Sequence, residues 1–286
     1  MLIPKRLIFI LLITIACTSF GKLELLGDLP NSLKEVSASE KIPNSNLIWV
    51  IEDSGNENIL YGLETTGEIS KYITLNEAKN IDWEDITADE YGNIYIGDFG
   101  NNNKKRTYFQ IYKVYNKELE NSTAKAHTIQ FTLPADTKPK DFEAFFIHKD
   151  IFYLFSKEHK IFSVFTVPNA VGTHTATYIS SLELEGKDTR VTSADISFDG
   201  KSVVLLNHKR LWKFTDYDET NFFSGKKEKL PLKYNSQKEG ICFKNDSILI
   251  ITDERHSTEG GNIYSFILNI WHNHAHYSFS ITKFWL

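Results

Sequence analysis

The chain has 286 residues, and its 37 aspartates and glutamates outnumber its 32 lysines and arginines, which gives a formal net charge of −5. This acidic balance argues against a nucleic-acid partner, because such partners require a basic surface. Two cysteines, Cys17 and Cys242, exclude a disulfide framework, and the length fits a single all-β domain.

Residues 1–21 have the pattern of a secretory signal peptide. Two basic residues precede an apolar run at residues 7–16, and small residues follow where a signal peptidase cleaves. The apolar run is too short to span a membrane. The alternative is a lipoprotein signal that ends before Cys17, although Thr14 stands where such signals usually have Leu. We therefore expect a mature chain of residues 22–286 that is secreted, periplasmic or on the outer surface, with a lipid anchor as the alternative.

The rest of the chain repeats one hairpin pattern five times. The clearest copy is DWEDITADEYGNIYIGDFGNN, residues 82–102, in which two half-apolar strands flank a turn at residues 89–93. The other copies occupy residues 35–53, 142–157, 193–208 and 238–254. An array of hairpins with a period of about 45–60 residues predicts the blades of a propeller.

Two further strands are predicted after each hairpin. The third strands are residues 59–63, 109–115, 162–167, 210–214 and 262–268, and the fourth are residues 72–75, 127–133, 177–184, 229–232 and 277–284. Residues 22–26 remain, and we expect them to pair with the C-terminal blade, since propellers protect their edges in this way.

The predicted fold is therefore an all-β domain, a β-propeller of five four-stranded blades. A six-bladed, TolB-like propeller is an alternative, because the wide spacing between Glu84 and Glu143 leaves room for irregular structure. An unrelated β-sandwich is a second alternative, but it does not account for repeats that are in phase.

Charged and polar residues gather at the open ends of the five hairpins. In an antiparallel hairpin the first strand begins beside the end of the second, so these residues should share one face of the propeller. That face is expected to carry Glu35, Asp53, Asp82, Glu84, Asp98, Asp141, Glu143, Lys157, Asp195, Asn207, His208, Glu239, Asp253 and Glu254. Like charges raise one another's pKa, so this many carboxylates require compensation.

A divalent cation, calcium in particular, would compensate these carboxylates, because calcium binds carboxylate and amide oxygens. The ligands that we predict are Glu84, Glu143, Glu239, Asp82, Asp98, Asp141 and Asp253. The structural alternative is that acidic residues at strand ends cap backbone N–H groups. A buried glutamate is costly without a partner, which favours the ligand role for the three glutamates that open equivalent strands.

Several motifs resemble those of a set of secreted bacterial β-propeller proteins. They are DWEDI, IGDFGNN with Arg106 after it, DFEA, and KEGI followed by ITDE. This set is similar to the SdiA-regulated, gluconolactonase-type and esterase-like phytase propellers. The resemblance implies a divalent metal, usually calcium, near the mouth of the central tunnel. It also implies that some relatives hydrolyse lactones or phosphate esters there.

Three functions fit the sequence. The first is a binding propeller that holds a cation or a small ligand, and the second is a metal-assisted hydrolase of an ester, lactone or phosphoester. The third is a module that binds a cell-surface component. The sequence has no G-x-S-x-G, H-E-x-x-H or P-loop motif, which favours binding, although a metal-bound water leaves no such motif. We expect a monomer without a membrane span after the signal is removed.

Overall fold

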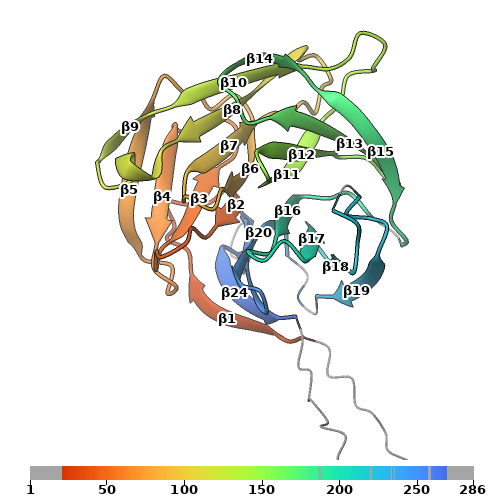
Figure 1. The fold of residues 1–286 in the computed structure, drawn as a ribbon. Helices are drawn as coiled ribbons and strands as arrows, with labels where there is room; N and C mark the ends of the chain where they lie inside the picture. Colours follow the sequence, from red (N-terminus) through yellow and green to blue (C-terminus); the bar gives the residue numbers. More distant parts are fainter. Residues whose placement is uncertain are drawn as a thin grey trace, which may run out of the picture.

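The computed structural model describes residues 21–186, 188–219, 221–232, 234, 236–256 and 259–268. Over these residues the protein is an all-β propeller in which five sheets surround a central axis (Figure 1). A three-residue 3-10 helix, η1 (Asn116–Glu118), is the sole helix of this described part, so no helix in it is suited to cross a bilayer. The predicted class and the five blades are confirmed, and the six-bladed alternative is wrong.

In blades 1 to 4 the four main strands follow one another in chain order from the axis outward. Blade 1 contains β2 (Val36–Glu40), β3 (Ile48–Glu52), β4 (Ile59–Leu63) and β5 (Ile69–Asn76). Blade 2 contains β6 (Trp83–Ala88), β7 (Ile94–Asp98), β8 (Tyr108–Val114) and β10 (His127–Thr132). Blade 3 contains β11 (Phe142–His148), β12 (Ile151–Ser156), β13 (Ile161–Pro168) and β15 (Thr177–Glu183). Blade 4 contains β16 (Ser193–Ile196), β17 (Ser202–Asn207), β18 (Arg210–Thr215) and β19 (Lys226–Pro231).

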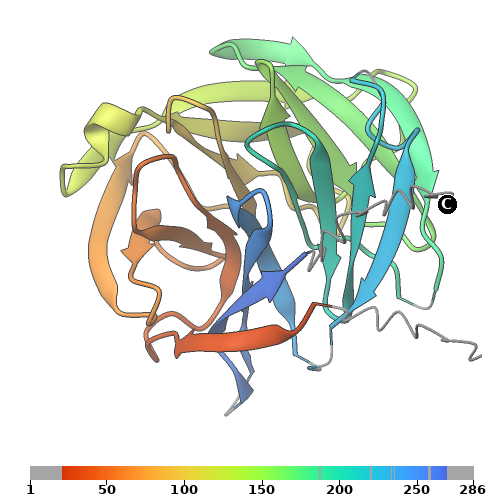
Figure 2. The same ribbon diagram turned by 60° about the horizontal axis from the view of Figure 1, so that its bottom comes forward.

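Blade 5 closes the ring with strands from both halves of the chain. It contains β20 (Lys238–Asn245), β21 (Ile248–Asp253), β24 (Asn262–Ile267) and, outermost, β1 (Leu23–Asp28). The red strand β1 runs antiparallel to blue β24 (Figure 2). The predicted pairing of residues 22–26 is thus confirmed. The strand predicted at residues 277–284 lies outside the described residues. A two-stranded hairpin, β22 (Arg255–His256) with β23 (Glu259–Gly260), precedes β24.

The wide spacing between Glu84 and Glu143 is explained by an extra strand rather than an extra blade. The connection between β8 and β10 contains η1 and β9 (Thr123–Lys125), and β9 pairs in parallel with β5 of the preceding blade. In the same way, β14 (Gly172–Thr175) in blade 3 pairs in parallel with β10 of blade 2. These short strands cover two outer edges that would otherwise expose unpaired backbone groups.

The hydrophobic core is divided into five clusters, one between each pair of neighbouring blades. The cluster between blades 2 and 3 is mostly aromatic. Its Phe142 ring packs edge-on against those of Phe109 and Phe165, with centroids 5.4 and 5.7 Å away. The large aromatic content of the sequence therefore fills the wedges between blades, where large rings bury most area.

Side chains on the inner strands also join neighbouring blades by hydrogen bonds. Asp85 on β6 accepts the backbone N–H of Phe145 on β11, and Asp195 on β16 accepts that of Phe243 on β20. Ser193 donates to Asp85 at 2.9 Å. These contacts fix the five inner strands around the axis. The strands begin at one end of the axis, which we call the mouth, and reach their hairpin turns at the other, which we call the turn end.

Candidate metal centre at the mouth

The three repeated glutamates lie at β-bulges. The strand registers shift between Trp83 and Asp85, between Phe142 and Ala144, and between Lys238 and Gly240. The extra residue of each bulge is Glu84, Glu143 or Glu239. A bulge turns a side chain away from the regular alternation of a strand. The repeated glutamate therefore reflects a repeated backbone irregularity at the mouth.

Two further positions of the repeat bring charged groups to the mouth. Asp53, Lys157, His208 and Glu254 each follow the last residue of the second strand of a blade, and Glu35, Asp82 and Asp141 each precede a first strand. The electrostatic influence of these groups on one another shows that they are neighbours: Glu254 is affected by Glu239, Asp53, Glu35 and His208. Most of the predicted acidic face therefore gathers at one end of the axis.

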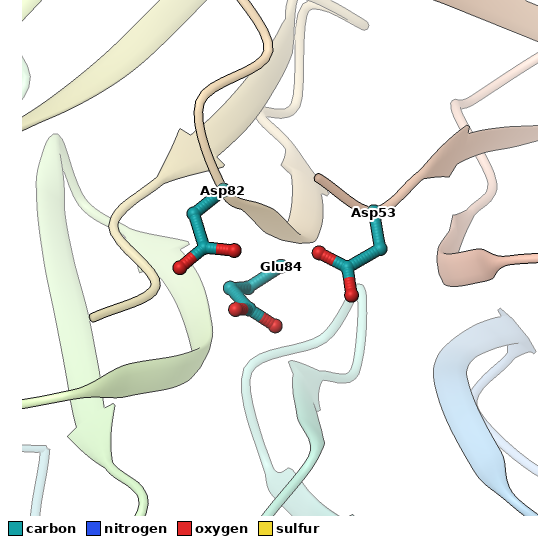
Figure 3. Close-up of side chains that lie close together, drawn as sticks. All are labelled: Asp53, Asp82 and Glu84. Carbon is teal, nitrogen blue, oxygen red and sulfur yellow. The ribbon is translucent and has the colours of Figure 1, made fainter. Parts of the chain in front are cut away.

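Asp53, Asp82 and Glu84 form the tightest group. One carboxylate oxygen of each lies within 4.8 Å of one from each of the others. Figure 3 shows the carboxylates of Asp53 and Asp82 on either side of Glu84. Ligands at the usual calcium distance, roughly 2.4 Å from the ion, are at most about 5 Å apart, so this spacing fits one shared ion.

Two residues outside the predicted set hold this group together. Asn80 donates from its side chain to the carbonyl oxygens of Glu52 and Asp53, at 2.9 and 2.8 Å, and thereby joins the end of β3 to the segment before β6. Gly100 lies against the carboxylates, because a Cβ there would be 2.1 Å from Glu84 Oε1 and 2.5 Å from Asp82 Oδ2. The second glycine of GDFGNN signals this close approach, whereas Asn80 lies outside any motif.

Glu84 is buried without a partner of its own. Its exposed fraction is 7%, and among the described residues its carboxylate has no hydrogen bond or salt bridge. Burial raises the Glu84 pKa well above its usual value, and the charges of Glu143, Asp53 and Asp82 raise it further. The Lys157 charge lowers this pKa, but Lys157 pairs with Glu143, so an ionised Glu84 has no ion-pair partner of its own among the described residues.

Two nitrogen-bearing side chains at the mouth, Lys157 and His208, already have carboxylate partners. Lys157 Nζ lies 2.5 Å from Glu143 Oε1. Burial alone would lower the Lys157 pKa, but the Glu143 charge raises it, so the lysine stays charged. His208 Nε2 lies 2.9 Å from Glu239 Oε1. Glu143 and Glu239 were predicted as ligands, and in this arrangement each already has a neighbouring nitrogen.

Three predicted ligands also make structural hydrogen bonds. Asp98 is fully buried and pairs with Arg106 at 2.8 Å while it accepts the N–H of Asp82. At the end of β21, Asp253 accepts hydrogen bonds from Ser236, Asn262 and Tyr264.

Asp141 accepts the N–H of Asn101 at 2.6 Å, and burial raises its pKa. These contacts order the loops around the mouth. We therefore leave Asp98, Asp141 and Asp253 out of the ligand set that we propose below.

The prediction that Asp195 lies at the mouth is wrong. Strand β16 has only four residues, Ser193–Ile196, so Asp195 is close to the hairpin turn. It lines a cavity at the turn end together with Glu40 and His148. The turn residues Asp199 and Gly200 follow Asp195 closely in the sequence, and this is the signal that could have shown how short the strand is.

A cavity of about 290 Å³ opens at the mouth. Its lining includes His208, Glu254, Ser236 and His256. Asp53, Asp82 and Glu84 do not line this cavity, and Glu254, whose pKa the Asp53 charge raises, connects it to that group. The site as a whole thus combines an oxygen-rich centre with a polar hollow of the size that small ligands occupy.

The fold and the mouth define a five-bladed propeller with an acidic mouth, and comparisons with known proteins support the fold. No family model and no curated protein matches the sequence. Similar solved structures include hydrazine synthase from Kuenenia stuttgartiensis, at 12% identity and a TM-score of 0.42, over 80% of this chain and 58% of that chain. This chain thus spans little more than half of the hydrazine synthase chain.

Two other similar structures are matched over nearly their whole length. One carries a gluconolactonase description, at 10% identity and a TM-score of 0.49, over 87% of this chain and 92% of that chain. The other is the PQQ-bound aldose sugar dehydrogenase from Streptomyces coelicolor, at 9% identity and a TM-score of 0.51, over 86% and 98%. Of these two, the dehydrogenase has a TM-score above 0.5, and at 9% identity its likeness shows the fold alone. That fold agrees with the propeller part of the resemblance seen in the motifs.

The raised acid pKa values predict how stability depends on pH when no metal is present. Burial raises the pKa of Asp53 to about 6 and of Glu254 to about 7. Between pH 5 and 8 the folded state therefore holds protons that the unfolded chain has released, so stability falls as the pH rises. In chelator, we expect the melting temperature to drop by roughly 5 °C or more over this range, at about 1.4 kcal/mol per pKa unit and 2–4 °C per kcal/mol.

The control for this prediction is Glu84→Gln, which removes one of the buried charges. Its melting temperature should depend less on pH than that of the wild type. Burial also raises the pKa of Asp195, at the turn end, to about 7. Asp195 therefore also makes stability fall as the pH rises, and this contribution is the same in Glu84→Gln and in the wild type. A melting temperature that is constant or rises from pH 5 to 8 in chelator would contradict the prediction.

Proposed function

We propose that this protein is a cation-binding propeller whose mouth holds calcium through Asp53, Asp82 and Glu84. The observation that carries the proposal is the convergence of three carboxylate oxygens within 4.8 Å around a buried glutamate that lacks a partner. Calcium fits this group because it accepts carboxylate oxygens in flexible geometry and completes its shell with water and carbonyl oxygens. Zinc and copper fit less well, since the group contains no histidine or cysteine.

We further propose that a small ligand binds in the mouth cavity, near the cation. A cation at the mouth would leave coordination positions open toward a ligand, because three carboxylates do not fill the six to eight sites of calcium. The ligand is a small molecule or a group on a cell-surface component. Export to the periplasm or beyond, inferred from residues 1–21, would place the mouth where calcium is abundant.

Melting curves with and without calcium test the proposal. A ligand at a hundred times its dissociation constant stabilises the folded state by about 2.7 kcal/mol, which corresponds to roughly 5–11 °C in a chain of this size. We expect calcium to raise the melting temperature by such an amount and chelator to reverse it. Glu84→Gln and Asp82→Asn should each abolish most of the shift.

The matched control is Asp246→Asn, an exposed aspartate in the turn between β20 and β21, which should retain the full calcium shift. If the mouth carboxylates serve only to cap backbone groups, the outcome differs. Calcium and chelator then give identical melting curves, and Glu84→Gln changes stability by the same amount in both. That result would refute the proposal.

One observation favours a second candidate function, metal-assisted hydrolysis of an ester, lactone or phosphoester. His208 lines the mouth cavity, and Glu239 holds its ring at 2.9 Å, which is the arrangement of a general base oriented by a carboxylate. A bound cation would polarise the substrate. If the protein is such a hydrolase, His208→Ala loses at least about a hundredfold in turnover of a model lactone or ester and keeps the calcium shift. If wild-type turnover equals that of His208→Ala, binding alone is the function.

A further inference from the structure

A second cavity lies at the turn end of the axis, away from the mouth. Its volume is about 340 Å³, and it is lined by the connections between the first and second strands of blades 1 to 4. Glu40 from blade 1 and Asp195 from blade 4 contribute to its wall, with exposed fractions of 4% and 6%. The cavity is large enough for a small organic molecule.

The two carboxyl groups are close enough to influence each other, and they have no cationic partner. Burial raises the Glu40 pKa well above its usual value, and the charge of Asp195 raises it further. Their hydrogen bonds come from backbone N–H groups: Lys41 donates to Glu40, and Ile196 and Phe243 donate to Asp195. Among the described residues, no side chain donates a hydrogen bond to either carboxyl group.

The basic side chains in the wall of the cavity are occupied elsewhere or neutral. Lys41 donates its ammonium group to the carbonyl oxygens of Ser45 and Leu47. Lys149 pairs with Glu219 at 2.6 Å. Burial and the Lys149 charge lower the pKa of His148, so that its imidazole is neutral at pH 7. The two buried carboxyl groups therefore remain uncompensated.

Two aromatic side chains mark the rim. Tyr91 and Phe198 line the cavity, yet 71% and 53% of their surfaces are exposed, so neither ring is part of the core. Exposed rings beside a polar hollow are suited to contact a bound molecule, and the faces of aromatic rings attract cations. The acidic wall and the aromatic rim therefore both favour a cationic ligand.

We propose that the turn-end cavity is a second binding site, which takes a small organic cation with its ammonium group against Glu40 and Asp195 and its apolar part against Tyr91 and Phe198. An ammonium group supplies the positive charge that the carboxyl pair lacks, and its N–H groups add to the backbone donors. A bare metal ion fits less well, because among the described residues three close ligand atoms are found only in the group at the mouth. This proposal is independent of calcium binding.

The test uses benzylammonium as the probe and benzyl alcohol as its uncharged analogue, in titrations followed by calorimetry with saturating calcium. We expect saturable binding of benzylammonium, and at least tenfold weaker binding of benzyl alcohol. Asp195→Asn should weaken benzylammonium binding at least tenfold. Tyr91→Ala and Phe198→Ala should weaken it severalfold, and because both side chains are exposed these variants should fold normally.

Asp82→Asn serves as the control, since the mouth is also acidic and offers the probe an alternative site. It should bind benzylammonium as the wild type does. The proposal is overturned if benzylammonium does not bind saturably to the wild type or if the alcohol binds equally well. It is also overturned if Asp82→Asn removes binding while the rim variants and Asp195→Asn retain it.

Discussion

The close approach of five inner strands around one axis is the constraint on which the rest of the structure depends. Neighbouring blades are joined there by side chains that accept backbone N–H groups, as Asp85 does from Phe145 and Asp195 from Phe243. The approach is so close that a Cβ on Gly240 would lie 2.6 Å from the backbone nitrogen of Ser39. Polar groups buried in this way stabilise the ring only while every donor has its acceptor.

This constraint also explains why charge accumulates at both ends of the axis. A carboxyl group within an inner strand needs N–H donors from a neighbouring blade, as Asp85 has from Phe145, and the other carboxyl groups lie where the strands begin and where they turn. At the mouth, bulges direct Glu84, Glu143 and Glu239 to one side, and Lys157 and His208 pair with the latter two. Glu84 is left unpaired beside Asp53 and Asp82, and this imbalance is the physical argument for the cation site that we propose.

Local patterns in the sequence predicted much of this arrangement. The alternation of apolar and polar residues in the strands, together with the turn residues between them, indicated the hairpins. The repeat of these hairpins in phase indicated five blades and the closure by β1. The glutamate at the start of three blades marked the mouth. Contacts between distant residues were not predictable, because they leave no local pattern: Asn80 joins blades 1 and 2, and His208 pairs with Glu239. The predicted position of Asp195 was wrong because it depends on the length of one short strand.

The most direct measurement of the central claim is an anomalous difference map from crystals soaked in manganese, which replaces calcium at oxygen-rich sites. A cation bound as we propose gives a peak within roughly 2.0–2.6 Å of carboxylate oxygens from Asp53, Asp82 and Glu84. A map with no peak at this group, in crystals where Glu84 instead pairs with a protein cation such as Lys157, would contradict it.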